Sequence, residues 1–141
     1  FIATVKKDKQ SKILVGGNVN KSNGWFVEPT VVDTKNPKSL TMCEEIFGPV
    51  VTLTPFSTQS EAIELANSTP YGLAASVWTS NLQTAHSVAH QLESGIVWVN
   101  CWMLRDLRTP FGGVKQSGLG REGGFEALKF FTEEKNICIK L

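Results

Sequence analysis

The sequence has no long apolar run and no strong charge of either sign. No stretch of about eighteen consecutive apolar residues, the length that a membrane-spanning helix needs, occurs among the 141 residues. Lys and Arg number 14 against 13 Asp and Glu, and the formal net charge of +1 leaves no large field to attract nucleic acid or an anionic membrane. We therefore expect neither nucleic acid nor a membrane as a partner.

Cysteine is also scarce. The three cysteines, Cys43, Cys101 and Cys138, are odd in number and widely spaced. This pattern fits neither a disulfide framework nor a zinc site with paired ligands. A reducing compartment is the simpler expectation, and the cytoplasm is the predicted location.

The bulk composition is that of an ordinary globular domain. A chain of 141 residues with 41% hydrophobic and 19% charged residues is long enough for one core and too short for two. The chain begins with Phe1, and Phe1–Val5 reads as the end of a helix whose start is missing. We expect it to be a C-terminal piece of a longer polypeptide.

From Val50 onward, the pattern predicts a strand, a helix, a strand, a helix and another strand, joined by short polar connections. Thr58 and Glu61 have the spacing of a capping box, and Ser80 or Asn81 is placed to cap the second helix. The segment 96–99 is apolar on both faces, as expected in the middle of a parallel sheet. The predicted fold class is α/β, a mostly parallel sheet with helices on both faces, with 96–99 as its most buried strand.

Shorter elements are expected on either side of this pattern. Residues 12–15 suit a strand that ends at Gly16 and Gly17, and 25–33 suit a strand interrupted by Pro29. Further expected elements are a helical turn over 40–43, a helix over 122–131 and a last strand over 136–141. The last strand alternates apolar and polar residues and needs a partner strand.

The segment Glu44–Pro49 reads as a shaped loop that enters a strand, because Gly48 and Pro49 both disfavour helix. Such a loop could present the Glu45 carboxylate to sugar hydroxyls and the Phe47 ring to a planar ligand. The alternative is a solvated acidic turn with Phe47 in the core.

The loop over residues 101–111 follows the buried strand at its carboxyl end, where open α/β sheets place ligands. Arg105 and Arg108 lie among apolar residues there, and a buried guanidinium without a partner is costly. An anion should meet at least one of them. The alternative to a bound ligand is Asp106 or another carboxylate of the protein.

Two further patterns have simpler structural explanations. Residues 118–123 match G-x-G-x-x-G, but no apolar strand precedes them, so a packed turn with glycines at positive φ is expected. His86 and His90 are four residues apart on a predicted helix, opposite its apolar stripe. A solvated face is expected there, without a metal site.

Long motifs follow one another along the chain in a characteristic order. They are Glu44–Pro49, Asn67–Ala75, Gly95–Asn100 and Pro110–Gly118. Together they resemble the later part of the catalytic domain in the NAD(P)-dependent aldehyde dehydrogenase superfamily, and the resemblance covers essentially the whole chain.

The resemblance implies a cofactor role for Glu45 and Phe47. In the family, the second Glu of this motif hydrogen-bonds the ribose next to the nicotinamide, and the Phe packs on the nicotinamide side. NAD is the expected cofactor, and the choice between NAD and NADP stays open. The family's nucleophilic cysteine, which forms a thiohemiacetal and then a thioester, lies upstream together with the general base. This chain therefore carries no catalytic residue, and Cys101 aligns with a pocket-lining position.

The sequence of the loop after the buried strand resembles one particular branch of the family. Residues 101–113 look like the branch of the family that acts on 2-hydroxymuconic and 2-aminomuconic semialdehydes, whose substrates carry a carboxylate. The expected substrate-binding residues are Arg105, in a bidentate carboxylate contact, together with Phe111 and Cys101 in the pocket wall. Arg108 is expected to pair within the protein.

The expected organisation assigns residues 1–131 to the catalytic domain and 132–141 to a strand that joins subunits into a homo-oligomer. The full-length protein would oxidise an aldehyde to the carboxylic acid with NAD, and the 141-residue piece would be inactive alone. The alternative is a non-enzymatic module that binds to aldehyde dehydrogenase subunits.

Overall fold

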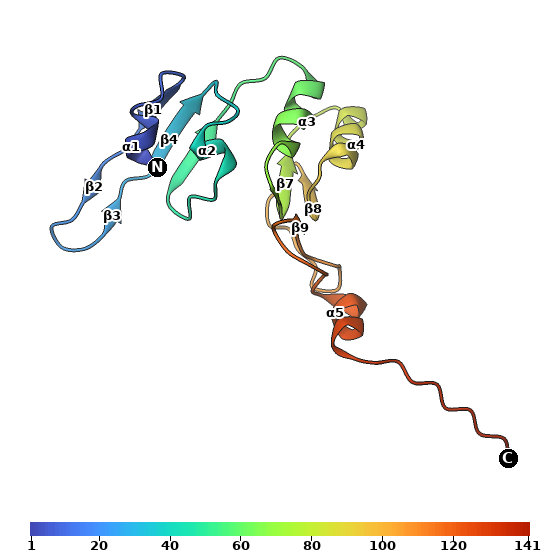
Figure 1. Cartoon of the computed structure of the whole chain (residues 1–141). Helices are drawn as coiled ribbons and strands as arrows, with labels where there is room; N and C mark the ends of the chain where they lie inside the picture. Colours follow the sequence, from blue (N-terminus) through green and yellow to red (C-terminus); the bar gives the residue numbers. More distant parts are fainter. The chain divides into compact units, whose positions relative to one another are not determined.

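The computed structural model describes residues 1–141, which divide into two compact units, Phe1–Leu65 and Ala66–Leu141. The first unit contains α1 (Ile2–Val5), β1 (Ser11–Val15), β2 (Val19–Asn20), β3 (Phe26–Val27), β4 (Thr30–Thr34), α2 (Leu40–Cys43) and β5 (Val50–Leu53) (Figure 1). Helix α3 (Gln59–Asn67) leads from the first unit into the second. The second unit contains β6 (Tyr71–Gly72), β7 (Ala74–Val77), α4 (Leu82–Gln91), β8 (Ile96–Val99), β9 (Val114–Lys115) and α5 (Gly124–Phe131).

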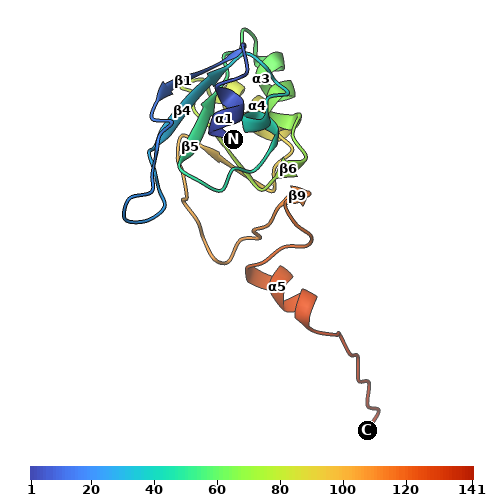
Figure 2. The same cartoon turned by 60° about the vertical axis from the view of Figure 1, so that its left-hand side comes forward.

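A three-stranded sheet forms the centre of the first unit. Strand β4 lies in the middle, antiparallel to β1 and parallel to β5 (Figure 2). Its residues alternate between buried and half-buried, and Thr30, Val32 and Thr34 are almost fully buried. The β-branched side chains of β4 therefore form the core of this unit.

Several local predictions for the first unit are confirmed. Strand β1 ends at Gly16 and Gly17, whose φ angles of 72° and 85° suit only glycine well. Pro29 separates β3 from β4, and 40–43 form one short helix. At the start of α3, Glu61 N donates to Thr58 Oγ1 at 3.1 Å, and the Glu61 carboxylate accepts from Ser57 N at 2.7 Å. The capping box thus forms, except that the Glu61 carboxylate accepts from the N–H of Ser57 and not from that of the N-cap residue Thr58.

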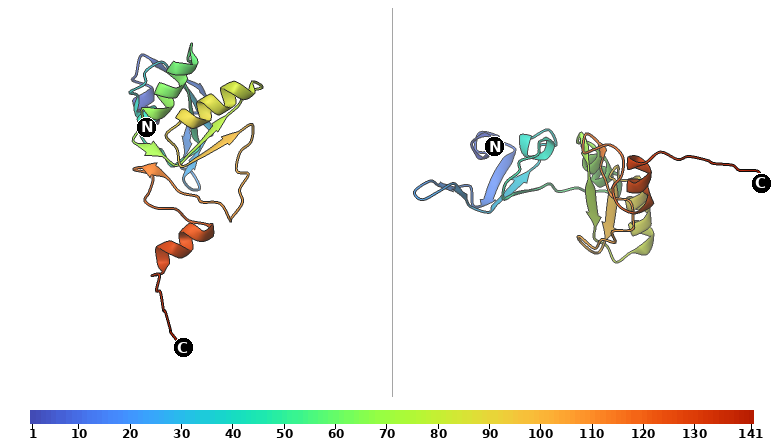
Figure 3. Two further views of the ribbon diagram at one scale, coloured as in Figure 1. Left: turned by 90° about the vertical axis from the view of Figure 1, so that its right-hand side faces the viewer. Right: turned by 90° about the horizontal axis from the view of Figure 1, so that it is seen from below.

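In the second unit, β7 and β8 are parallel and α4 connects them. Helix α4 packs on both strands (Figure 3), and its residue Ala85 is buried. Its first turn is capped as predicted, because Asn81 Oδ1 accepts from Thr84 N at 2.9 Å. This βαβ unit confirms the α/β class.

One sheet prediction is wrong, and the strands divide among several sheets. They form a three-stranded sheet of mixed direction and the two-stranded sheets β2-β3, β6-β9 and β7-β8. Residues 96–99 are not the most buried strand, because β8 has a neighbour on one side only and buries only Trp98. Strand β4, with a neighbour on each side, is more buried.

The end of the chain also differs from the prediction. The expected helix over 122–131 begins at Gly124, after Gly123 with its φ of 85°. Residues 132–141 form no strand, and all their side chains are exposed. A strand needs a neighbour for its backbone hydrogen bonds, and nothing in the single chain supplies one.

None of the helices combines the length and hydropathy needed to cross a membrane, and the longest, α4, has 10 residues.

Candidate functional site

The loop between α2 and β5 displays the predicted cofactor residues. The Phe47 side chain is 93% exposed, and the Glu45 carboxylate is exposed and has no hydrogen bond or ion pair. Phe47 also has a φ of 53°, which is rare for a bulky side chain and costs energy. The alternative that Phe47 lies in the core is therefore wrong.

A shallow hollow of about 350 Å³ adjoins this loop within the first unit. Glu45 is absent from its lining, which consists of Thr41, Met42, Glu44, Ile46, Phe47, Gly48 and residues 50–52 of β5. The loop thus offers a ring beside a hollow and a free carboxylate nearby. The cofactor roles of Glu45 and Phe47 stay predictions.

The predicted substrate-side residues all lie in the second unit, in the loop that follows β8. Asn100 opens this loop with a φ of 53°, which asparagine tolerates better than most residues. Its side chain donates to Thr79 O at 2.8 Å and accepts from Thr79 N at 2.9 Å. These two hydrogen bonds therefore join the segments that follow β7 and β8.

Further hydrogen bonds hold the loop that carries Arg105. Ser76 Oγ donates to Cys101 O at 2.7 Å, and Trp98 Nε1 donates to Leu104 O at 2.7 Å. Trp98 is buried and packs edge-to-face on Trp102, with ring centroids 5.0 Å apart. The backbone immediately before Arg105 is thus anchored to β8.

Arg105 lies between an aromatic ring and a carboxylate. Its guanidinium carbon is 4.0 Å from the centroid of the Phe111 ring, within cation–π range. Its Nη2 donates to Glu122 Oε1 at 2.7 Å. A guanidinium has five N–H donors, so this single bond leaves four available.

The other arginine of the loop pairs locally, as predicted. Arg108 donates from Nε and Nη2 to both carboxylate oxygens of Asp106, at 2.5 to 3.1 Å. The side-chain and backbone hydrogen bonds from Arg108 lower the pKa of Asp106, and the carboxylate raises the pKa of Arg108. Carboxylates of the protein therefore meet both arginines, which is the alternative that the sequence left open. Arg105 uses one of its five donors on a carboxylate, whereas Arg108 uses its Nε–H and an Nη2–H.

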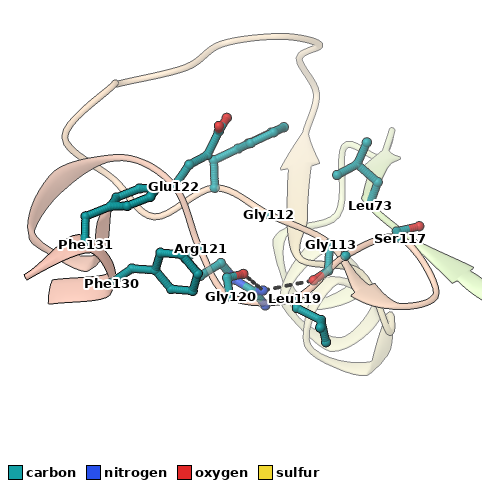
Figure 4. A pocket seen from close by; sticks show the side chains of 12 residues that line it. Leu73, Gly112, Gly113, Ser117, Leu119, Gly120, Arg121, Glu122, Phe130 and Phe131 are labelled. Carbon is teal, nitrogen blue, oxygen red and sulfur yellow. Dashed lines mark hydrogen bonds between the residues drawn. The ribbon is translucent and has the colours of Figure 1, made fainter. Parts of the chain in front are cut away.

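A hollow of about 380 Å³ lies beside these residues in the second unit (Figure 4). Phe130 and Phe131 of α5 line one side, and Leu73 and Ser117 line the other. Of the predicted substrate-side residues, Phe111 belongs to the lining, whereas Arg105 and Cys101 do not. The substrate roles of all three residues stay predictions.

The glycine-rich segment is a packed turn, as expected. Gly118, Gly120 and Gly123 all have positive φ angles, and Arg121 Nη1 donates to Gly113 O at 2.9 Å and Gly120 O at 2.7 Å. Arg121 thus closes the turn that leads to α5.

Cysteine and histidine form no constellation of their own. All three cysteines are free, with Cys101 and Cys43 half-buried and Cys138 exposed. His86 and His90 are exposed on α4, as the predicted solvated face requires. The structure contains no cluster of three His, Cys, Asp or Glu residues that could hold a metal ion.

Sequence reasoning did not identify Glu122 as the partner of Arg105. The two residues are 17 positions apart, and no local spacing rule links them. The alternation around Phe111 and Glu122 is too short to predict the backbone bridge that brings them together.

Comparison with known proteins places these features in a family. Residues 2–137 match the aldehyde dehydrogenase family. The chain is 53% identical over 139 residues to 2-hydroxymuconic semialdehyde dehydrogenase of Pseudomonas putida, covering 95% of this chain and 29% of that protein. It is 52% identical over 117 residues to 2-aminomuconic semialdehyde dehydrogenase of Homo sapiens, covering 83% of this chain and 24% of that protein.

A solved structure shows the same fold. The NAD+ complex of an aldehyde dehydrogenase from Bacillus cereus has a TM-score of 0.87 and 46% sequence identity, covering 94% of this chain and 27% of that one. The chain therefore spans between a quarter and a third of the length of most such relatives.

Proposed function

The chain belongs to the aldehyde dehydrogenase family, and from this premise we propose that it serves, within a longer protein, in the NAD-dependent oxidation of an aldehyde that bears a carboxylate. A muconic semialdehyde fits this description. The similarity to 2-hydroxymuconic and 2-aminomuconic semialdehyde dehydrogenases supports the substrate class.

The observation that carries the proposal is the state of Arg105. Its side chain is 31% exposed, it uses one of five donors, and its guanidinium lies on the Phe111 ring. A planar guanidinium with free donors matches a carboxylate in a bidentate contact. Arg108 is a poorer candidate, because Asp106 already occupies its fork.

In this proposal, Glu45 and Phe47 face the cofactor. The exposed, unpaired carboxylate can accept from vicinal ribose hydroxyls, and the exposed ring can pack on a planar group. NAD, when bound, supplies the acceptor for the hydride of the aldehyde. The NAD+ complex of the Bacillus cereus relative supports a nicotinamide cofactor, and titration with NAD and NADP in parallel distinguishes the two.

We also propose that residues 1–131 belong to the catalytic domain and that 132–141 join subunits of a homo-oligomer in the cytoplasm. The apolar side chains of Ile137, Ile139 and Leu141 are exposed and lack a partner strand. Deleting residues 132–141 is expected to yield a smaller species in size-exclusion chromatography. An unchanged assembly would exclude this role.

The experiment that tests the substrate class compares two aldehydes in the full-length protein, one with a carboxylate and one uncharged and of equal length. Arg105→Ala is expected to lower kcat/KM for the carboxylated aldehyde by about 10-fold to 100-fold, the value of a charged hydrogen-bond pair. Arg108→Ala is the matched control and should leave the preference unchanged. If Arg105→Ala leaves the preference intact, the assigned substrate class is wrong.

The 141-residue chain alone is expected to be inactive, because none of its cysteines is assigned as the nucleophile. The measurement is NADH formation by the purified chain with aldehyde and NAD. Oxidation above background would contradict this prediction.

A further inference from the structure

We propose that Glu122 is the positioning residue of the Arg105 guanidinium, and that it thereby strengthens the preference for carboxylated aldehydes. This inference rests on the proposed function, in which Arg105 receives the substrate carboxylate. It assigns to Glu122 a role that is separate from binding the substrate itself.

The backbone places Glu122 where it can act on Arg105. Phe111 N donates to Glu122 O at 2.8 Å and Glu122 N donates to Phe111 O at 2.7 Å, forming an antiparallel bridge. In such a doubly bonded pair, the two side chains project from the same side. The ring and the carboxylate therefore reach the guanidinium together, at 4.0 Å and 2.7 Å.

A close approach of two backbones fixes this arrangement. Gly124 N donates to Leu107 O at 3.2 Å, and a Cβ at Gly124 would lie 2.3 Å from Arg108 O. The start of α5 thus packs directly on the loop that carries Arg105. Glu122 precedes this contact by two residues, so the contact fixes the position of the Glu122 carboxylate relative to the loop.

The geometry of the ion pair suits positioning. Glu122 takes a single bond from Nη2. Asp106, by contrast, takes bonds from both Nε and Nη2 of Arg108. One anchoring bond restricts the rotamers of a long, flexible side chain and leaves its other donors for a second carboxylate. Without the anchor, ordering Arg105 would add to the cost of substrate binding.

The negative charge of Glu122 also has an opposing effect. It competes with the substrate carboxylate for Arg105. Its side chain is 65% exposed, however, so water and salt weaken a repulsion across the site. The positioning effect is therefore expected to exceed the competition.

A series of variants in the full-length protein separates these effects. Glu122→Ala removes both the charge and the acceptor, and is expected to raise KM for the carboxylated aldehyde about fivefold, as expected for freeing one long side chain. KM for the uncharged aldehyde should change less than about twofold. Glu122→Gln keeps an acceptor oxygen at the same reach and should have the smaller effect. Glu122→Asp, one methylene shorter, should resemble Glu122→Ala and replaces it if that variant does not fold.

The control is Glu126→Ala, an exposed carboxylate in the first turn of α5. A lower KM for the carboxylated aldehyde in both Glu122→Ala and Glu122→Gln would show competition and overturn the inference. An equal loss of kcat with both aldehydes would also overturn it. If Arg105→Ala abolishes the preference and the Glu122 variants do not change it, only this inference fails. If Arg105→Ala has no effect, the proposed function fails.

Discussion

Lys115 offers the sharpest test of how the second unit is held together. Its ammonium donates to Asn67 O at 2.7 Å and Thr69 O at 3.2 Å, and pairs with Glu93 Oε2 at 2.6 Å. The side chain is only 24% exposed. Lys115 thus ties β9 to the end of α3 and to the segment before β8.

Lys115→Met keeps the length of the side chain and removes all three contacts. The ion pair contributes about 0 to 1 kcal/mol, because the Glu93 side chain is 57% exposed, and the hydrogen bonds from a charged donor to carbonyls contribute about 1.5 to 3 kcal/mol each at most. Because the carbonyls can partly rehydrate, we expect Lys115→Met to lower the free energy of unfolding of the second unit by about 2 kcal/mol. The φ of 54° is the same in both variants, so backbone strain cancels from the comparison.

The assay is native-state hydrogen exchange of amides that join the same segments. Gln116 N donates to Pro70 O at 3.0 Å, and Gly72 N donates to Ser117 Oγ at 2.9 Å. A loss of about 2 kcal/mol predicts exchange about 30-fold faster at these amides.

The matched control is Lys129→Met, which alters an exposed lysine in the last turn of α5. It should change the exchange of these amides less than about threefold, as expected for a surface substitution. If Lys115→Met has no larger effect than this control, the contacts of Lys115 do not stabilise the unit and the reasoning is refuted.

Three further predictions concern the loops. Phe47→Gly relieves the strain of a positive φ and removes an exposed ring, so the free energy of unfolding should not fall. In the full-length protein the same change should weaken NAD binding, measured by fluorescence titration. An unchanged affinity for NAD would exclude the cofactor role of Phe47. Trp98→Phe removes the hydrogen bond to Leu104 O and should raise KM for a carboxylated aldehyde about fivefold. An unaltered KM would show that this hydrogen bond does not contribute to substrate binding. Because the hydrogen bonds from Arg108 lower the pKa of Asp106, their contact stabilises the fold above the ordinary pKa of an Asp carboxyl, and this contribution is lost as the pH falls through the lowered pKa. The stabilities of wild type and Asp106→Asn in acid unfolding should therefore converge once the pH is below the lowered pKa of Asp106, and stabilities that stay apart at low pH would contradict this.

The features that sequence predicted best depend on neighbouring residues. The cap at Asn81 and the break at Pro29 follow from interactions within a few positions, and the structure confirms both. The loop at Glu44–Pro49 was predictable for the same reason, because Gly48 and Pro49 disfavour helix wherever they occur.

The features that sequence missed depend on partners distant along the chain. The sheet of the first unit pairs β5 with β4, and hydrophobic periodicity does not reveal which strands become neighbours. Residues 136–141 have a strand pattern without a strand, because a pattern cannot supply the missing neighbour. The Arg105–Glu122 ion pair depends on a backbone bridge that joins residues 11 positions apart, Phe111 and Glu122.

The most direct test of the central claim is a crystal structure of the full-length protein with the dicarboxylate product of a muconic semialdehyde. The proposal predicts a product carboxylate within hydrogen-bond distance of Arg105, with the guanidinium still on the Phe111 ring and bonded to Glu122. A product carboxylate bound elsewhere, with Arg105 contacting Glu122 alone, would contradict it.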